Sequence, residues 1–443
     1  MEYRYREQKE LIKGELGNIP KSWNQAKAQY YFDVFAGGTP STNEPKYWDG
    51  DIPWINSGEV QNCYITNVSR YITNQGLKES STKLIPKNTT VLAMTGATCG
   101  NVGYLQFDST ANQSVMAFVP KYSYNSKFLY YYLMCQSQQI EYYKTGGAQG
   151  GINVDNGKKL YINIPLDEEQ EKIANFLDKK TSKFNSIISK KEALIEKLEE
   201  AKKSFISEVV TGKMKVIKND DGYDLVKRSN DEMKDSGVEW LGEIPKDWEV
   251  KKFSHIIKIS NGQVNPKIEP YSNMILIAPN HIRSNMGKII ALETANSQGA
   301  DSGKYFCNKG DIIYSKIRPN LCKVCIAPLD CLCSADMYPM KTDSKLLNQE
   351  YLLWILLSDN FTKYVVLDSD RVAMPKVNRE SLSKFKIPVP TLQEQNLLNT
   401  VLKDKDKNID CLISKIKLQI EKLKEAKQSL ISEAVTGKIE IMD

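Results

Sequence analysis

The sequence predicts an α+β protein that arose by tandem duplication, with two globular mixed α/β domains separated by two long helices that form an antiparallel coiled coil. Three observations predict this. Residues 165–213 align with residues 390–438 without a gap. Each aligned segment contains a long stretch free of proline and glycine, and the regions before the segments contain short strand-like runs separated by polar turns.

The two ends of the repeat share one offset of 225 positions. LIEKLEEAKKSFISEVVTGK, ending at Lys213, aligns with QIEKLKEAKQSLISEAVTGK, ending at Lys438. The same shift aligns GNIPKSW, ending at Trp23, with GEIPKDW, ending at Trp248. Because both ends of a repeat recur at one offset, the chain is interpreted as a duplication.

The regions between these ends share only a skeleton. In the alignment of residues 21–164 with residues 246–389, INIP matches IPVP and Asn153 matches Asn378, but most other side chains differ. A constant part combined with a variable part suggests one scaffold that carries two different specificities.

A long helix is expected in each constant part. The first runs from Glu168 to about Val210, where Gly212 supplies a stop signal. In the second copy the apolar spacing follows a heptad pattern at Ile409, Ile413, Ile416, Ile420, Leu423 and Leu430. The first copy has Phe184, Ile188, Ile195, Leu198 and Phe205, interrupted by Lys191 and Lys202. At roughly 1.5 Å per residue, about 30–40 residues give a rod of about 45–60 Å. An amphipathic helix packed on its own domain remains the alternative.

Mixed α/β structure is expected in the variable parts. The runs DIPWI, TTVLAM, SVMAFV, MILIA, DIIYSKI and KVCIA are typical of strands. The predicted boundaries are 1–164 for the first domain, 165–214 for the first helical region, 215–245 for a linker, 246–389 for the second domain and 390–443 for the second helical region.

Composition restricts the class of protein. The chain has 443 residues, a net charge of +6 and no apolar run long enough to cross a membrane. The charged N-terminus is unlike a signal peptide, and nine cysteines in such a chain are expected to be reduced thiols in a cytoplasm. We therefore expect a cytoplasmic protein with no membrane partner.

Motifs for catalysis within the chain are missing. The sequence has no Asn-Pro-Pro-aromatic tetrapeptide, and the Gly-Lys pairs at Gly212 and Gly437 are not followed by Ser or Thr. With only His255 and His281, a histidine-rich metal site is excluded. A metal-nuclease pattern at Asp33 and residues 44–46 is explained better by chance, because the same Glu-x-Lys triplet recurs inside the helices.

Four cysteines permit a metal site on paper. Cys322, Cys325, Cys331 and Cys333 have a spacing that is not a common zinc spacing, and the first copy has no counterpart. Reduced cysteines packed in strands are the favoured interpretation, and the sequence does not decide between the two.

The duplicated motifs closely resemble a known family. The Pro-x-x-x-Glu-Gln opening of each helix, the closing SFISEVVTGK and SLISEAVTGK, the GEIPKDW motif and the AGGTPS loop are similar to those of the specificity (S) subunit of type I restriction–modification systems. The resemblance covers nearly the whole chain.

The resemblance implies a non-catalytic subunit with two target-recognition domains, each recognising one half of a split, asymmetric site on double-stranded DNA. It implies that the helical regions set the gap between half-sites and dock two adenine methyltransferase subunits, which restriction subunits join. No cofactor is then expected in this chain, because S-adenosylmethionine, ATP and Mg belong to the partner subunits.

Candidate contacts follow from the polar loops and the helices. DNA contacts are predicted in the first domain at Thr39, Ser41, Thr42, Thr95, Thr98, Gln149 and Asn153. In the second domain they are predicted at His281, Arg283, Lys316, Arg318, Arg371, Lys376 and Asn378. Partner contacts are predicted at Gln170, Leu198, Phe205, Gln395, Ile420 and Leu423, although capping of the helix starts is an equal possibility for the two glutamines.

A second class of function remains open from the residues alone. The chain could be a coiled-coil assembly scaffold whose variable domains bind protein. Steep salt dependence of DNA binding would separate the two, since each phosphate contact contributes a log–log slope of about −0.9.

Overall fold

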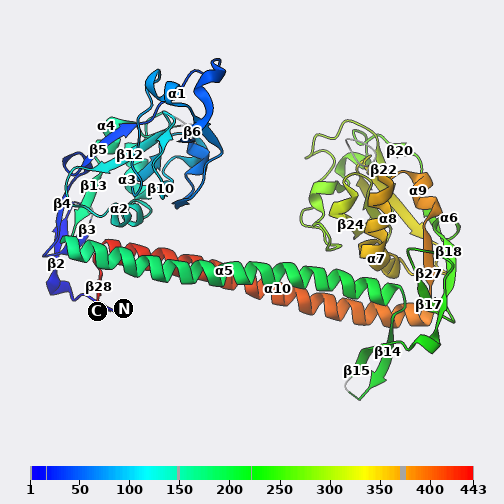
Figure 1. The fold of residues 1–443 in the computed structure, drawn as a ribbon. Coiled ribbons are helices and arrows are strands. Elements are labelled where there is room, and N and C mark those ends of the chain that lie inside the picture. The colour runs from blue at the N-terminus through cyan, green and yellow to red at the C-terminus, as the bar shows by residue number, and fades with distance from the viewer. Residues whose placement is uncertain (1, 16, 147–149, 221, 370–375, 443) are drawn as a thin grey trace. The chain divides into compact units, whose positions relative to one another are not determined.

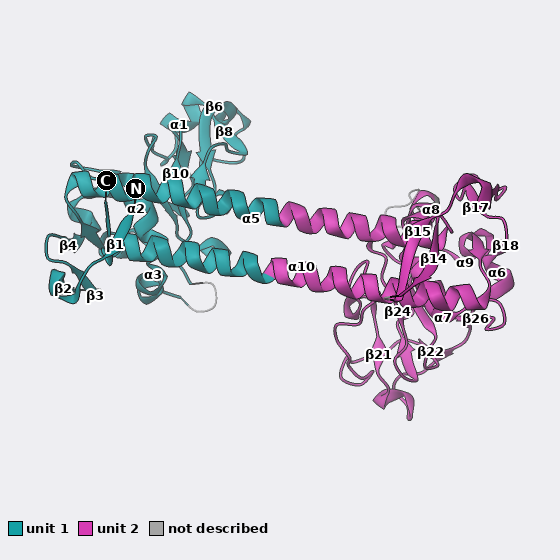
Figure 2. Ribbon diagram, turned by 90° about the horizontal axis from the view of Figure 1, so that it is seen from below, with its two compact units in different colours: residues 1–191, 418–443 teal, residues 192–417 magenta. Residues whose placement is uncertain are grey.

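The computed structural model describes residues 2–15, 17–146, 150–220, 222–369 and 376–442 (Figure 1). The chain divides into two compact units. Unit 1 comprises residues 1–191 and 418–443, and unit 2 comprises residues 192–417 (Figure 2). Each unit therefore takes in parts of both sequence copies. The boundaries predicted from the repeat follow the copies instead, and they stay predictions.

Two helices of 44 residues dominate the constant parts: α5 (Asp167–Val210) and α10 (Leu392–Val435). Both continue through the division between the units, and α5 agrees with the helix predicted from Glu168 to Val210. Each is longer than the 30–40 residues expected.

Unit 1 contains the strands β1 (Tyr3–Tyr5), β2 (Leu11–Gly14), β3 (Gly17–Pro20), β4 (Asn24–Lys27), β5 (Phe32–Ala36), β6 (Trp48–Ile55), β7 (Cys63–Ile65), β8 (Arg70–Ile72), β9 (Thr90–Ala93), β10 (Val102–Leu105), β11 (Thr110–Ala111), β12 (Val115–Pro120), β13 (Tyr161–Ile164) and β28 (Ile439–Ile441). Its shorter helices are α1 (Asn74–Lys78), α2 (Ser126–Leu133), α3 (Ser137–Tyr143) and α4 (Val154–Lys158).

Unit 2 contains the strands β14 (Met214–Asn219), β15 (Gly222–Lys227), β16 (Met233–Asp235), β17 (Glu243–Pro245), β18 (Glu249–Lys252), β19 (Ile257–Ile259), β20 (Gln263–Val264), β21 (Leu276–Ile277), β22 (Lys304–Cys307), β23 (Ile312–Ser315), β24 (Val324–Ile326), β25 (Cys331–Cys333), β26 (Met337–Thr342) and β27 (Lys386–Val389). Its shorter helices are α6 (Phe253–Ile256), α7 (Gln349–Leu357), α8 (Asp359–Ser369) and α9 (Arg379–Lys384). Every run predicted to be a strand contains one.

The central sheets of the two units correspond. In unit 1 the strand order is β5-β12-β9-β10-β7, and in unit 2 it is β19-β26-β23-β24. In both sheets the first four strands pair antiparallel, and β7 is added parallel to β10 in unit 1 only. The second sheets differ, since unit 1 has β11-β6-β8 and unit 2 has β20-β22-β25-β21. The shared skeleton therefore includes this central sheet, together with the two-stranded sheets β4–β13 and β2–β3 of unit 1 and their counterparts β18–β27 and β16–β17 of unit 2.

The long helices lie side by side and antiparallel within each unit (Figure 2). In unit 1, Lys427 contacts Asn185 and Gln419 contacts Lys191, so residue numbers rise along one helix as they fall along the other. The predicted seam is buried at Ile188, Ile195, Ile413, Ile416 and Ile420, each at most 9% exposed. Lys191 and Lys202, which interrupt the first seam, each find a polar partner on the opposite helix.

One strand pair differs between the units in how its strands are joined. In unit 2, β14 and β15 form an antiparallel hairpin. In unit 1 the equivalent pair is β1 with β28, which come from the two ends of the chain. Met214 lies 225 positions before Ile439, so β14 and β28 are copies of each other.

Candidate DNA-recognition and subunit-docking site

A joint in unit 1 holds the start of α5 against the GNIPKSW motif. The Glu169 carboxylate accepts a hydrogen bond from the indole nitrogen of Trp23 at 2.8 Å and forms an ion pair with Arg6 at 2.5 Å. Trp23 is only 2% exposed, so its N–H has no access to water and needs this acceptor. A glutamate in the first helical turn also interacts favourably with the helix dipole.

The next residue connects α5 to the variable part. The Gln170 side chain accepts a hydrogen bond from the backbone N–H of Asn125 at 2.8 Å and donates one to the carbonyl of Pro165 at 2.9 Å. Asn125 in turn caps α2 by accepting hydrogen bonds from two backbone N–H groups. The start of α2 is thereby tied to the start of α5.

Unit 2 repeats the joint, and Trp248, Glu394 and Gln395 are the second copies of Trp23, Glu169 and Gln170. Arg228 and Asn348 take the places of Arg6 and Asn125 but do not stand at the 225-residue offset. Glu394 accepts from Trp248 at 2.9 Å and pairs with Arg228 at 2.6 Å. Burial raises the pKa of Glu394 above its ordinary value, while the Trp248 and Arg228 contacts oppose that rise. Gln395 accepts from the N–H of Asn348 at 2.7 Å and donates to the carbonyl of Pro390 at 2.9 Å. The Glu-Gln dipeptide thus has the same two tasks in each unit.

The glycine that ends each long helix belongs to the same joint. Gly437 has φ +73°, and a Cβ there would lie 2.4 Å from Pro20. Gly212 has φ +78°, and a Cβ there would lie 2.3 Å from Pro245. Only glycine combines a left-handed conformation with so close an approach. The helix end of one copy therefore packs on the opening motif of the other copy.

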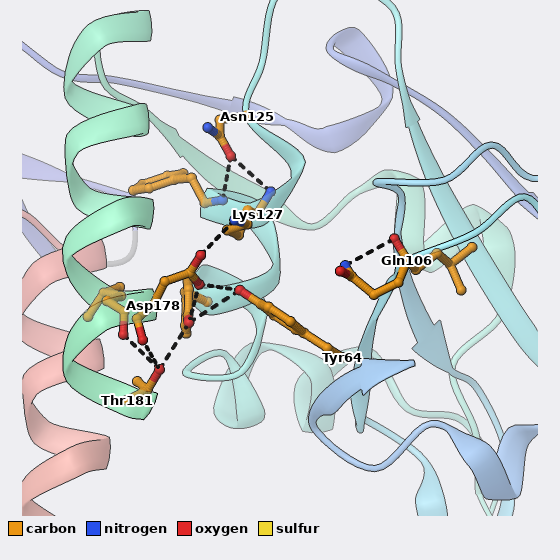
Figure 3. A network of polar contacts seen from close by, with 10 residues as sticks. Tyr64, Gln106, Asn125, Lys127, Asp178 and Thr181 are labelled. Carbon is orange, nitrogen blue, oxygen red and sulfur yellow. Dashed lines mark hydrogen bonds and ion pairs between the residues drawn. The ribbon is translucent and has the colours of Figure 1, made fainter. Parts of the chain in front are cut away.

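A polar network fixes the variable part of unit 1 to α5 (Figure 3). The Asp178 carboxylate accepts hydrogen bonds from the hydroxyl groups of Tyr131, at 2.7 Å, and of Tyr64. Lys127 forms an ion pair with its second oxygen at 2.6 Å, and Tyr131 also contacts Thr181 at 3.1 Å. Burial, followed by the Asp178 hydrogen bond, raises the pKa of Tyr64, so Tyr64 stays a donor at neutral pH.

Three loops of unit 1 meet at one edge of its central sheet. Strands β5 and β9 both pair antiparallel with β12, so their C-terminal ends point the same way. Thr39 follows β5 and contacts the Gln113 side chain. Thr95 and Thr98 follow β9, and the N–H of Ile152, next to Asn153, donates to the carbonyl of Met94 at 3.0 Å. Four of the predicted DNA contacts are therefore neighbours in space.

Unit 2 brings the equivalent loops together. The N–H of Val377 donates to the carbonyl of Lys316 at 2.8 Å, and Ile317 forms a bridge with Lys376. This pairing is the copy of the contact between Ile152 and Met94. Lys316, Arg318 and Lys376 therefore lie at the edge of the unit 2 sheet that corresponds to the edge with Thr95 and Thr98 in unit 1.

Comparisons with known proteins follow the two sequence copies rather than the two units. A family model described as the type I restriction modification DNA specificity domain matches residues 20–197 and 245–422. The chain belongs to this family. It is 28% identical to the type I restriction enzyme MjaIX specificity subunit of Methanocaldococcus jannaschii, over 99% of this chain and 98% of that protein. It is 27% identical to the EcoDI specificity subunit of Escherichia coli, over 71% of this chain and 70% of that one.

A solved structure supports the fold. A chain from a study of complex assembly and conformational transition of the type I R-M system superposes with a TM-score of 0.70, at 14% identity, over 95% of this chain and 99% of that one. The two specificity domains thus have the tandem α+β arrangement that the sequence predicts. Specificity subunits of this family are non-catalytic and carry no cofactor, and catalysis lies in other subunits.

The structure places the remaining predicted DNA contacts of the specificity domains differently. Ser41 and Thr42 are exposed further along the first loop, where the Ser41 carbonyl accepts from Trp48 at 3.1 Å. Asn153 and Asn378 are exposed and cap α4 and α9, each accepting a hydrogen bond from a backbone N–H. Their recurrence therefore has a local structural reason.

The second domain requires one correction. His281 is 3% exposed, and its Nδ1 lies 3.1 Å from the carbonyl of Leu276 and 3.2 Å from the N–H of Ala278. A buried imidazole held by backbone groups has no surface for DNA, so His281 is no longer among the proposed contacts. Arg283 is exposed in a neighbouring loop. Gln149 and Arg371 lie outside the described residues.

The predicted partner contacts also divide by burial. Gln170, Gln395 and Ile420 are at most 5% exposed. The two glutamine side chains are used within the joints, and the Ile420 side chain packs in the helix seam. Leu198, Phe205 and Leu423 keep part of their surface and remain proposed contacts.

Sequence reasoning missed two polar side chains at the sheet edges. Gln113 is exposed between β11 and β12 beside Thr39. Arg379 lies 5.3 Å from the ring centre of Tyr338 and donates to the carbonyl of Ser260 at 2.9 Å. Only the strand register brings these residues to the loops, although the position of Arg379 directly after Asn378 was a possible clue.

The four cysteines of the possible metal site are core residues. Cys325, Cys331 and Cys333 are buried in β24 and β25, and Cys322 is buried just before β24. Across the described ranges, no group of three or more His, Cys, Asp or Glu side chains is arranged to hold a metal ion. Within the same ranges, no helix has the length and apolar character to span a membrane.

Proposed function

We propose that this chain recognises a split, asymmetric site on double-stranded DNA, with one half-site bound by each variable part. The supporting observation is the combination of an identical joint with different loops. Glu169 and Glu394 make the same contacts, yet the sheet edge carries Thr95 and Thr98 in unit 1 and Lys316 and Arg318 in unit 2. Hydroxyl groups and guanidinium groups prefer different base edges.

The constant parts are proposed to dock two adenine methyltransferase subunits, through which restriction subunits join the complex. Two equal joints in one chain would supply two equivalent attachment points. The length of α5 and α10 is proposed to set the unspecified gap between the half-sites. S-adenosylmethionine, ATP and Mg are assigned to the partner subunits.

A modified-base map of the host genome tests the recognition role. We expect deletion of the gene to remove N6-methyladenine from one asymmetric, interrupted motif. An unchanged map in a host whose methyltransferase is expressed would contradict the proposal. Salt-independent DNA binding by the purified complex would then favour the coiled-coil scaffold that binds protein.

The same map sharpens the assignment of Arg318. A chain with Arg318→Ala should relax discrimination at one position of one half-site by about 1–3 kcal/mol if this side chain contacts a base. An equal loss of affinity for all sequences would assign it to a phosphate. Thr42→Ala in unit 1 is the matched control, because it should leave that half-site unchanged.

A further inference from the structure

The two long helices carry lysines at one pair of equivalent seam positions. Lys202 in α5 and Lys427 in α10 are separated by the repeat offset of 225. In unit 2, Lys202 pairs with Asp406 at 2.5 Å and with Asp410 at 2.7 Å. Lys288 of the variable part also pairs with Asp410. Two lysines and two aspartates make a closed cluster without net charge.

The equivalent positions in unit 1 lack both carboxylates. Asp406 and Asp410 correspond, at the same offset, to Thr181 and Asn185. The Lys427 ammonium donates a hydrogen bond to the side-chain amide oxygen, Oδ1, of Asn185 at 3.0 Å. Among the residues that the structure describes, no carboxylate lies within ion-pair distance of Lys427. Burial, with a smaller effect of Lys424, lowers the pKa of Lys427.

A cavity of about 500 Å³ opens at this lysine. Its wall includes Tyr64, Tyr131, Met134, Asn185 and Lys427. Asp178 also lines the cavity, but its carboxylate is occupied by Lys127 and Tyr64, which are labelled in Figure 3, and by Tyr131. The site therefore combines aromatic walls with one cation whose charge no neighbour balances.

We propose that this cavity receives a carboxylate side chain of a docked methyltransferase subunit. The inference rests on the proposed function and deepens it. A partly buried cation is stabilised by a carboxylate that becomes buried beside it, because the two charges compensate each other. A neutral amide leaves the charge of the cation uncompensated. Both α5 and α10 line the cavity, and none of the lining residues belongs to the loops at the sheet edge assigned to DNA.

The two units would then bind copies of the same methyltransferase subunit with unequal affinity. In unit 2 the equivalent lysine is already neutralised by its own aspartates, so an incoming carboxylate has no cation to pair with. We expect two copies of the methyltransferase to bind in two steps, with the tighter step at unit 1.

Asn185→Asp tests the proposal by placing an internal acid where unit 2 has Asp410. Binding to the purified methyltransferase subunit of the same system is measured by calorimetry on the full chain. We expect a higher Tm for the free chain and a tighter step weakened about tenfold to a hundredfold, because the lysine is already paired. The matched control, Asp410→Asn, should lower Tm and leave the tighter step unchanged.

Three outcomes would overturn the proposal. An unchanged tighter step in Asn185→Asp, together with a raised Tm, would confine Lys427 to helix pairing. Weakened DNA binding with unchanged assembly would assign the cavity to a phosphate. Absence of any binding between the wild-type chain and the methyltransferase would refute the proposed docking itself. Lys427→Met provides a second variant, which should weaken the same step without adding an acid.

Discussion

In unit 1 the variable part is fixed to the long helix by Lys127 and Asp178, whereas in unit 2 Glu350 and Lys403 make the corresponding ion pair with the charges exchanged. Lys127 and Glu350 are each the second residue of a helix capped by asparagine. Asp178 and Lys403 are separated by 225 positions. The position of the ion pair is repeated, but its sign is not.

This difference contrasts with the joints, which are the same in both units. Glutamate, glutamine, tryptophan and glycine each meet a steric or hydrogen-bonding requirement that no other residue meets as well. An ion pair near the surface works in either direction. Exchanging its sign makes the wrong combination repulsive, since Lys127 facing Lys403 would place like charges together. Each variable part is thereby matched to its own segment of helix.

The largest expected difference between the units concerns the two seam lysines. Lys202→Met leaves Asp406 and Asp410 mostly buried without their main cation, and it should destabilise unit 2 by about 3–5 kcal/mol. Lys427→Met loses one neutral partner and should cost about 1 kcal/mol or less. Urea unfolding, monitored by hydrogen exchange of peptides from each unit, measures both free energies. Equal losses would show that the charge asymmetry has no energetic meaning.

Substitution of the glycine at either helix end should have the same effect on stability in both units. Gly212→Ala and Gly437→Ala each force a side chain into a left-handed conformation against a proline, and each should cost about 2 kcal/mol. Thermal unfolding of the two single variants measures this. A cost found for only one of them would contradict the claim that the joints are equivalent.

The exchanged ion pairs should show a smaller difference. Lys127→Glu removes a cation from the partly buried Asp178 and should cost about 1.5 kcal/mol. Glu350→Lys affects an exposed pair and should cost about 0.5 kcal/mol. Adding Lys403→Glu should restore the second variant. Adding Asp178→Lys should fail to restore the first, because Tyr64 and Tyr131 would lose their acceptor. Tm values of the four variants decide this.

The constant parts could be predicted from the sequence because their residues are repeated for specific contacts. Glu169, Gln170 and Gly437 all recur, and each has a defined partner in the joint. Two identical copies cannot show which helix end meets which motif. Only the structure reveals that Trp23 packs with the second copy's glycine.

The loops proposed to contact DNA were less predictable. Polar composition selected loop segments, but it could not separate an exposed side chain from a buried one. The Nδ1 atom of His281 contacts backbone groups, and no sequence pattern predicts this contact. Gln113 and Arg379 reach their sites through strand register, which depends on the whole sheet.

The pairing of β1 with β28 has a consequence for the chain as a whole. Its counterpart in the other unit, the β14–β15 hairpin, is longer, with six paired positions instead of three, and its two strands are consecutive in the chain. In each unit, a strand that follows the long helix of one copy therefore pairs with a strand that precedes the globular part of the other copy. Joining the present ends and cutting the turn after Asn219 would yield a circular permutant with the two halves in reverse order and every strand pair retained. We expect this permutant to fold, which would show that neither unit depends on the order of the two copies along the gene.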